Sequence, residues 1–449
     1  MTFVDLPGGQ GGSITVVAAA LRDRTVTRLR AAEGDGIVAG MTDVDIVHPV
    51  PVEEVPAWAE TLTINFLNDP TEEGHQRFTT RLQRDWLPDR FWGARAGAHW
   101  VGTLGAWPHT LTVPGGNTVP ADALTMVSVA GTHRRRGLLT RMLTESLSAA
   151  HQRGDAVSIL WAAEWPIYGR FGYAPATITA SYTLRPRSPG GRLDGADGDL
   201  RRVDAAELGT LAPEIFARAA RQRAGNIDRP QRWWSGMLGL DGYPEPRFDG
   251  KRPTQVVHEG PHGPDGYIAW TAQDVAVDVV DLCAASDSAY RGLWAYVSSL
   301  DLVERVTLGR RPVDEPVRWL LPDGRALEQN ETVDGLWVRL LDVPAALGAR
   351  RYSVADRLVL DVVDDDTGGF AAGRYVLEGG PDGAKCLPST VDSANLRVHH
   401  RALAAAYLGG YRLQAQVITG RVEELTPGAL RRADAMFATS LAPWCATGF

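Results

Sequence analysis

Three consecutive arginines, residues 134–136, are followed directly by Gly137 in the stretch VSVAGTHRRRGLLTRML. An alternating apolar stretch closes at Val129, and apolar residues at helical spacing begin at Leu139. The arginines therefore stand at or near the start of a predicted helix, where unpaired N–H groups and the helix dipole are already positive. Cations gathered at that end are explained if a strongly anionic group binds there, such as a phosphate or pyrophosphate held by backbone N–H groups.

The elements around this motif follow from the apolar pattern. Two strands are predicted before the arginines, joined by a turn at residues 114–117 (PGGN), and a helical segment at residues 61–86 precedes both. Two common nucleotide motifs are missing, since there is no G-x-x-x-x-G-K-[ST] and no G-x-G-x-x-G after a strand. The alternative to an anion site is an ordinary solvated basic triplet.

The composition is that of a globular protein with a sizeable core, because 44% of the residues are hydrophobic and 22% are charged. A net charge of −8 argues against a nucleic-acid partner. The three cysteines, Cys283, Cys386 and Cys445, have neither disulfide-framework nor metal-ligand spacing, which favours a reducing cytoplasm. The apolar run at residues 14–21 is too short to span a membrane, so we expect no membrane association.

The chain of 449 residues is long enough for about three domains. Residues 1–45 form an N-terminal extension, and residues 46–187 form an α/β unit that contains the arginine motif. A linker-like stretch at residues 185–200 precedes a second α/β unit at residues 201–335. The last part, residues 336–449, has the pattern of an α+β domain. The predicted fold class is therefore α/β and α+β.

The two α/β units contain a short sequence match. Arg291, Gly292 and Leu293 align with residues 136–138, again after an apolar strand, and Tyr290 replaces the preceding arginine. Either the two units are duplicates and the second has lost most of its anion site, or a three-residue match has arisen by chance.

The R-R-x-G motif after VSV resembles the acetyl-coenzyme A pyrophosphate site of the GCN5-related N-acetyltransferases (GNAT). Together with IYGRFGYAPAT, GLWVRLLDVPAAL, LAAAYLGGYR and LRRADAMFATSLAPWCATGF, it is similar to the Eis (enhanced intracellular survival) family of acetyltransferases over about residues 46–449. The resemblance implies two tandem GNAT-type domains, the second without coenzyme, followed by a sterol-carrier-protein-like (SCP2-like) domain. It also implies homohexamers and transfer of acetyl from acetyl-coenzyme A to amines.

The resemblance also implies which residues bind the coenzyme. Along the strand, the pantetheine arm would meet backbone groups of Val127, Ser128 and Val129. The pyrophosphate would be held by Arg134, Arg135, Arg136, Gly137, Leu138, Leu139 and Thr140. Ala163 and Glu164 match positions beside the coenzyme.

Two residues match the catalytic groups of the family. Tyr168 matches the general acid, and a phenol with an ordinary pKa near 10 stays protonated at neutral pH yet can donate to a departing thiolate. Phe449 matches the residue whose terminal carboxylate is the general base, and the apolar ending LAPWCATGF suggests an anchored terminus. The alternatives are that Tyr168 simply packs in its aromatic, turn-rich segment and that Phe449 is an ordinary packed C-terminus.

The substrate positions depart from the family pattern. Family members that acetylate aminoglycosides have acidic residues where this chain has Asn68 and Gly448, while Phe78 replaces a common tryptophan and Met126 a common phenylalanine. A less acidic, more apolar pocket and a less cationic substrate are expected. No metal is expected, because His399 and His400 are interpreted as helix-surface or capping residues without a third ligand.

The predicted function is direct acetyl transfer from acetyl-coenzyme A to a primary amine of a small molecule, aminoglycoside-like or other, which would link the chain to antibiotic resistance. One alternative is a dedicated acyltransferase of a natural-product pathway or of self-resistance. The other is a non-catalytic protein that binds coenzyme A or a lipid.

Overall fold

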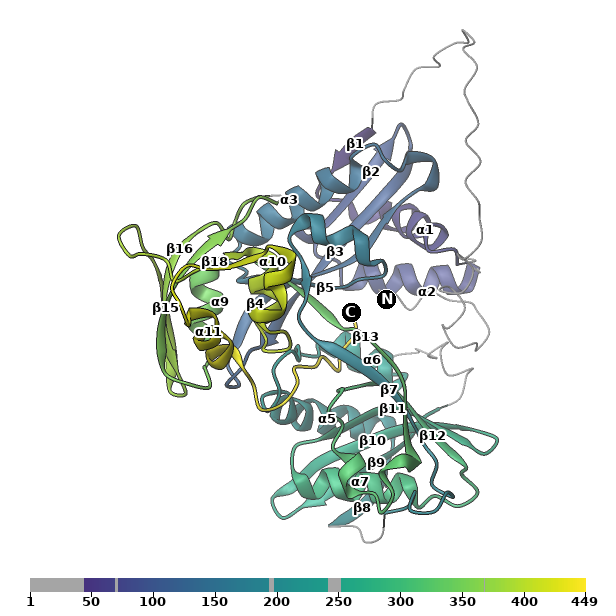
Figure 1. The fold of residues 1–449 in the computed structure, drawn as a ribbon. Coiled ribbons are helices and arrows are strands. Elements are labelled where there is room, and N and C mark those ends of the chain that lie inside the picture. Colours follow the sequence, from purple (N-terminus) through teal and green to yellow (C-terminus); the bar gives the residue numbers. More distant parts are fainter. Residues whose placement is uncertain (1–43, 69–71, 194–197, 241–251, 367) are drawn as a thin grey trace, which may run out of the picture. The chain divides into compact units, whose positions relative to one another are not determined.

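The computed structural model describes residues 44–68, 72–193, 198–240, 252–366 and 368–449 (Figure 1). The predicted N-terminal extension lies outside these residues except at its end, because strand β1 begins at Val44. The apolar run at residues 14–21 also lies outside them. Among the helices that the structure describes, none has the length and apolar character needed to cross a membrane.

The described chain divides into two compact units. The minor unit contains residues 44–105 and 126–142, and the major unit contains residues 106–125 and 143–449. Two strands and a helix pass from one unit into the other: β3 (His99–Thr112), β4 (Thr118–Val129) and α3 (Leu138–Gln152). The predicted pair of strands around residues 114–117 and the predicted helix after Gly137 are thereby confirmed.

The minor unit is built around aromatic side chains. Its elements are β1 (Val44–Val47), α1 (Val55–Asn65), α2 (Glu72–Arg84), β2 (Phe91–Ala96) and the first part of β3. Strand β2 pairs antiparallel with both β1 and β3. Trp58 is fully buried, and its indole N–H donates to the Trp92 carbonyl at 3.0 Å. The single helical segment expected at residues 61–86 is therefore two helices.

The first sheet has the strand order β1-β2-β3-β4-β5-β14-β6, and the early part of β4 pairs in parallel with β5 (Val157–Trp161). Strand β5 pairs antiparallel with β14 (Leu336–Leu340), and β14 pairs with β6 (Ala174–Pro175). Every residue of β5 and of β14 is buried, in keeping with sequences that are apolar except for Ser158 and Arg339.

The second sheet has the strand order β13-β7-β12-β11-β10-β9-β8 (Figure 1). Its strands are β7 (Ile178–Leu184), β8 (Asp199–Val203), β9 (Thr254–Gly260), β10 (Gly263–Gln273), β11 (Ala276–Ala284), β12 (Arg305–Arg311) and β13 (Leu327–Asp334). Successive strand residues such as Tyr267 and Ile268 belong to different core clusters, so helices cover both faces. Helices α5 (Ala205–Ala220) and α6 (Gln231–Leu238) pack on one face, and α7 (Asp287–Ser298) packs on the other.

The third sheet has the order β17-β16-β15-β18-β19. It comprises β15 (Asp356–Val363), β16 (Gly373–Gly380), β17 (Gly383–Pro388), β18 (Leu396–His399) and β19 (Val422–Glu424). The accompanying helices are α9 (Val343–Ala349), α10 (His400–Ala406) and α11 (Ala429–Phe437). The predicted combination of α/β and α+β parts is confirmed.

Two strands pair across the domain limits expected from the sequence. Strand β7 falls within residues 46–187 but pairs with β12 and β13 of the second sheet. Strand β14 opens the segment expected to be C-terminal, yet it pairs with β5 and β6 of the first sheet. The expected linker at residues 185–200 covers the connection between β7 and β8, except that its last two residues are the first two of β8; residues 194–197 lie outside the described residues.

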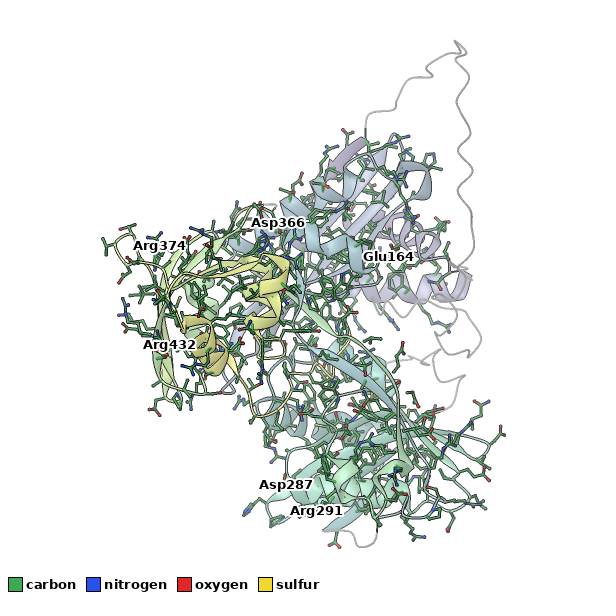
Figure 2. All side chains as sticks on the ribbon, in the orientation of Figure 1. Glu164, Asp287, Arg291, Asp366, Arg374 and Arg432 are labelled. Carbon is green, nitrogen blue, oxygen red and sulfur yellow. The ribbon has the colours of Figure 1, made fainter. Side chains whose placement is uncertain are left out.

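The expected match between Gly137 and Gly292 does not hold in the structure. Gly137 precedes helix α3 and has a φ of 75°. Gly292 and Arg291, which is labelled in Figure 2, lie within helix α7, whose N-cap is Ser286. The residues aligned by sequence therefore occupy different positions relative to their helices.

Candidate active site

The arginine loop of the minor unit lies where the sequence predicts it. Residues 134–137 are exposed and directly precede α3 at Leu138. Both Arg135, with a φ of 63°, and Gly137 adopt left-handed conformations, and a Cβ added at Gly137 would meet nothing within 4 Å. A turn of this kind can form a concavity of backbone N–H groups that suits an anion. The loop therefore fits a pyrophosphate in both charge and backbone conformation.

The end of β4 is held by a chain of side-chain hydrogen bonds within the minor unit. The Asn65 amide donates to the Ser128 hydroxyl at 3.0 Å, and that hydroxyl bonds to Thr103 at 2.8 Å. The Thr103 hydroxyl in turn donates to the Met126 carbonyl at 2.8 Å. Met126 has a φ of 54°, so the strand departs from regular geometry there. Because the Ser128 side chain is engaged in this chain, its backbone is the part left to contact a ligand.

The parallel ladder between β4 and β5 is short. It joins residues 121–123 to residues 157–159, whereas β4 continues to Val129 and β5 to Trp161. The segment predicted to contact pantetheine, residues 127–129, thus lies beyond the last residue of β4 that pairs with β5. A strand that outruns its ladder can offer backbone groups to an extended ligand.

Tyr168 ends α4 (Trp165–Tyr168), a short helix in the loop after β5. Ala163 and Glu164 precede this helix and are exposed; Glu164 is its N-cap residue (Figure 2). The Tyr168 side chain is buried, and its ring lies edge-on to that of Tyr173, with 6.2 Å between centroids. Burial, aided by the charge of Glu164, raises the pKa of the Tyr168 phenol well above its ordinary value. The phenol therefore stays protonated at any pH at which the enzyme would work.

Hydrogen bonds from neighbouring strands stabilise the loop that carries Tyr168. The Tyr173 hydroxyl bonds to Ser158 at 2.6 Å, and the Ser158 hydroxyl donates to the Asp122 carbonyl at 3.0 Å. The Tyr173 N–H donates to the Tyr168 carbonyl at 3.3 Å. Arg339 of β14 donates to the Phe171 carbonyl. Tyr173 thus has a structural role next to Tyr168.

The C-terminal tail, residues 441–449, is packed against the domain formed by the second sheet and helices α5–α7, as its apolar sequence predicts. Cys445 and Thr447 are fully buried. Three backbone N–H groups of the tail donate to that domain. The Ala442 N–H donates to the Asp314 carboxylate at 2.9 Å, and the Trp444 N–H donates to the Ala224 carbonyl at 2.9 Å. The Ala446 N–H donates to Asn226 Oδ1 at 3.1 Å. The last residue is therefore held in place rather than free.

Phe449 lies against β4 and two residues that the sequence did not single out. One oxygen of its terminal carboxylate accepts from the Thr125 hydroxyl at 3.4 Å, and its ring centroid is 5.7 Å from that of His109. His109 bonds through Nδ1 to Asp228 at 3.0 Å. The Trp233 indole N–H donates to the Gly448 carbonyl at 3.2 Å. No sequence motif marks Thr125 or His109, because only the fold brings them to the terminus.

The predicted substrate residues occupy both units. Asn68 follows α1 and is half-buried, and its N–H donates to the Thr63 carbonyl at 3.1 Å. Phe78 on α2 and Met126 on β4 are buried. These three residues belong to the minor unit, whereas Gly448 belongs to the major unit.

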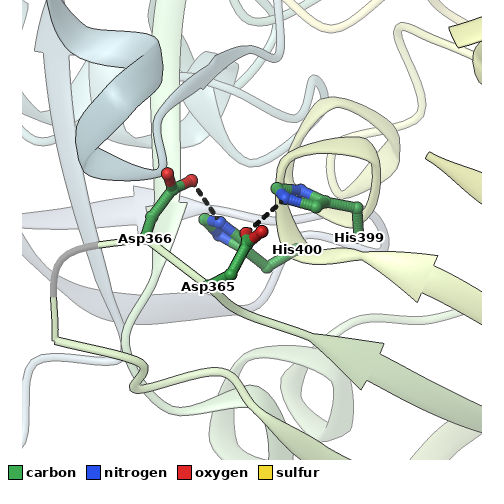
Figure 3. A group of neighbouring side chains, drawn as sticks. All are labelled: Asp365, Asp366, His399 and His400. Atoms are coloured by element: carbon green, nitrogen blue, oxygen red, sulfur yellow. Dashed lines mark hydrogen bonds and ion pairs between the residues drawn. The ribbon is translucent and has the colours of Figure 1, made fainter. Parts of the chain in front are cut away.

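His399 and His400 lie in a polar cluster with Asp365 and Asp366 (Figure 3). His399 accepts the Arg401 N–H through Nδ1 at 3.2 Å, which confirms its predicted capping role. The expectation that His400 is a surface or capping residue is wrong. His400 is buried, and its Nε2 lies 2.7 Å from Asp366 and 3.2 Å from Asp364. Tertiary folding brings Asp365 and Asp366 to histidines 34 residues away, so the expectation that no third potential ligand lies near the two histidines is also wrong.

The four side chains place their ligating atoms within 4.8 Å of one another, but their other bonds do not fit a metal ion. Histidines that bind metals usually donate through their second ring nitrogen to an acceptor. In this cluster His399 Nδ1 accepts a hydrogen bond, and buried His400 Nδ1 has no hydrogen-bond partner. Asp366 is also held by Arg401, at 2.7 Å from its Nε. We therefore interpret the cluster as a hydrogen-bonded network.

His400 should make the stability of the protein depend on pH. Burial, aided by Arg339, lowers its pKa from 6.5 to about 4. Below pH 6.5 the unfolded chain then binds a proton that the folded chain does not, so the free energy of unfolding falls as the pH drops from 6.5 to 4. The loss is on the order of 3 kcal/mol, at 1.36 kcal/mol per pKa unit.

Urea unfolding at pH 4.5 and pH 7 checks this prediction. His400→Gln keeps a neutral hydrogen-bonding group without the imidazole, so its stability should depend less on pH than that of the wild type. The matched variant His399→Gln should keep the wild-type dependence. Equal pH dependence in wild type and His400→Gln would contradict the prediction.

Comparison with known proteins defines the class. Residues 47–176 match the model of an acetyltransferase (GNAT) domain, residues 225–340 match a second such model, and residues 343–446 match a sterol carrier protein domain. The chain is thus an N-acetyltransferase with two GNAT domains followed by an SCP2-like domain. The duplication suggested by the sequence is confirmed at the level of domains, although the three-residue alignment that suggested it is not.

Relatives identify the family. N-acetyltransferase Eis of Mycobacterium tuberculosis is 34% identical over 362 residues, which cover 78% of this chain and 86% of the relative. An uncharacterized N-acetyltransferase of Streptomyces avermitilis is 38% identical over 420 residues, covering 90% and 98%. The crystal structure of Eis1 from Mycobacterium abscessus matches with a TM-score of 0.77 and 32% identity, covering 90% of this chain and all of that one. The chain belongs to the Eis family of GNAT acetyltransferases.

Proposed function

We propose that the protein transfers acetyl from acetyl-coenzyme A directly to a primary amine of a small molecule. The observation that carries the proposal is the terminal residue, which is anchored by its own tail and bonded at β4. A carboxylate held in this way can accept a proton at a defined position. GNAT acetyltransferases use acetyl-coenzyme A as donor, and the exposed arginine loop before α3 offers a cationic turn for its pyrophosphate.

The proposed binding contacts come from two segments. Backbone groups of residues 127–129 hold the pantetheine arm, and residues 134–140 hold the pyrophosphate, with Gly137 supplying a conformation that other residues rarely adopt. Ala163 and Glu164 lie beside the coenzyme. On the substrate side, Asn68, Phe78 and Met126 form a wall that carries no formal charge.

The proposed reaction is a single displacement. The Phe449 carboxylate accepts a proton from the amine, the amine nitrogen bonds to the thioester carbonyl carbon, and the carbon–sulfur bond breaks. Tyr168 donates its proton to the departing sulfur, and strand N–H groups stabilise the oxyanion. Direct transfer is supported by the cysteines, because burial raises the pKa of Cys283 and Cys386 to about 12 and that of Cys445 to about 11. Buried thiols of this kind are poor nucleophiles.

A less cationic substrate is also proposed. Asn68 and Gly448 are uncharged, and a cation lies next to His109, the residue whose ring is beside that of Phe449. Arg232 lies over the Trp107 ring, 4.4 Å from its centroid, and its Nη2 is 3.4 Å from His109 Nε2. A polycation would be repelled by this guanidinium. The domain limits, hexameric assembly, cytoplasmic location and link to antibiotic resistance stay predictions.

Release of the coenzyme A thiol from acetyl-coenzyme A tests the proposal. Untagged enzyme is assayed with kanamycin-like aminoglycosides, polyamines, lysine peptides and apolar monoamines. We expect amine-dependent release, with kcat/KM at least about tenfold higher for monoamines than for the polycations, equal to about 1.4 kcal/mol. Higher kcat/KM for the aminoglycosides would contradict the substrate class. Coenzyme binding without release for any amine would contradict the transfer itself.

A further inference from the structure

We infer that Arg229 is a positioning residue that orients the C-terminal carboxylate. It acts through Thr447 and, together with Trp233, through Gly448. This inference rests on the proposed role of Phe449 as the base. It gives the second GNAT domain a part in the reaction of the first: its residues would hold the tail at the point where the proton is accepted.

Arg229 lies in a closed aromatic and acidic site. Its guanidinium carbon is 3.8 Å from the ring centroids of both Phe216 and Trp233, and its side chain is 1% exposed. Nη1 is 2.6 Å from Asp281, and the Tyr267 hydroxyl donates to the same carboxylate at 2.7 Å. A buried guanidinium needs such a charge partner, and the planar group allows little rotation once stacked and paired. The direction in which the Nε–H of Arg229 points is thereby fixed.

The Nε–H of Arg229 points to the C-terminal tail. Arg229 Nε donates to the Thr447 hydroxyl at 2.9 Å, across 218 residues of sequence, and Thr447 is fully buried. The Trp233 ring, stacked on the guanidinium, donates its indole N–H to the Gly448 carbonyl at 3.2 Å. The two residues before Phe449 are therefore both held by one stacked pair. With Thr447 and Gly448 held, the position of the carboxylate depends only on the backbone torsion angles of Phe449.

A buried ion pair of this kind could also serve only to stabilise the domain. Asp281 alone would satisfy the charge of Arg229, so the bond to Thr447 is an additional one at the tail. Loss of that bond should change kcat, because a misplaced carboxylate accepts the proton less efficiently. The KM for acetyl-coenzyme A should change little, because the proposed coenzyme contacts lie on other segments.

Thr447→Val removes the acceptor for Arg229 Nε and keeps the side-chain shape. We expect kcat to fall about tenfold, with the KM for acetyl-coenzyme A within about twofold of wild type. Thr447→Ser restores the hydroxyl and should recover most of the kcat. Thr179→Val is the matched control, because that buried hydroxyl also donates one bond, to the Arg311 carbonyl at 3.3 Å, and this partner belongs to β12 and not to the tail.

Testing Thr447→Val in an enzyme with an extended C-terminus distinguishes failure of this inference from failure of the proposed function. In the enzyme with one glycine added after Phe449, Thr447→Val should lower kcat no further, because the added residue has already displaced the carboxylate that Thr447 would position. Full activity of the extended enzyme would overturn the role of Phe449 itself. If the extended enzyme is impaired but Thr447→Val has wild-type kcat, or slows the reaction no more than Thr179→Val, only the Arg229 inference fails.

Trp233→Phe keeps the inference testable if Thr447→Val does not fold. It removes the indole N–H that donates to Gly448 and leaves an aromatic ring over Arg229. We expect a kcat about threefold below wild type with unchanged coenzyme KM. Wild-type kcat in Trp233→Phe, with the fold intact by circular dichroism, would overturn the inference.

Discussion

Tyr168→Phe is expected to lower kcat by about 10²- to 10³-fold, the lower part of the range for a lost general acid. The variant removes only the hydroxyl that would protonate the departing sulfur. Because the ring stays buried against Tyr173, the fold and the KM for acetyl-coenzyme A should be nearly unchanged. The raised pKa of the Tyr168 phenol adds a second expectation, since its deprotonation should cause no fall in rate between pH 7 and pH 10.

Steady-state thiol release measures this effect, with Tyr173→Phe as the matched control. Tyr173 lies in the same loop region and bonds to Ser158, so its variant should lose stability rather than kcat. A Tyr168→Phe enzyme within about threefold of wild-type kcat would show that Tyr168 merely packs. An alkaline fall below pH 10 that disappears in Tyr168→Phe would contradict the raised pKa.

One glycine added after Phe449 is expected to lower kcat by at least about 100-fold, the lower end for a general base. The addition turns the Phe449 carboxylate into an amide and moves the negative charge by about 3.5 Å, the span of one residue. The tail cannot retract to compensate, because its backbone bonds at residues 442–446 and its buried Thr447 hold it in place. The proton acceptor would then be missing from its position.

Comparison of the untagged and extended enzymes measures the effect, with coenzyme binding and the unfolding temperature as readouts that should not change. Deletion of Phe449 is the matched control, because it shifts the carboxylate onto Gly448 without adding bulk. Both variants should be slow for the same reason. Wild-type kcat in either variant would assign the base to another group.

Local features of the protein were predictable from its sequence. The arginine loop, Gly137 and the start of α3 involve residues within a few positions of one another, so apolar spacing and dipole arguments suffice. The strands around residues 114–117 and the capping role of His399 are equally local. The motifs that resemble the Eis family are also contiguous, which is why they indicated the family before the fold was known.

Strand partners could not be predicted in the same way. A pattern of buried residues shows that β7 and β14 lie in sheets, but it does not say which sheet, because pairing depends on backbone groups that all strands share. The sequence order suggested that β7 belongs with the first domain and β14 with the last. The structure places each in another sheet.

The candidate active site shows the same division. The sequence by itself determined that a cationic turn precedes a helix and that its last residues are apolar and suited to packing. Only the tertiary structure decided that Phe449 meets Thr125, 324 residues away, and that Thr447 meets Arg229. It also decided that His400 is buried between carboxylates. The reason is physical: backbone and near-neighbour preferences act along the chain, whereas a buried polar group takes whichever partner packing brings within reach.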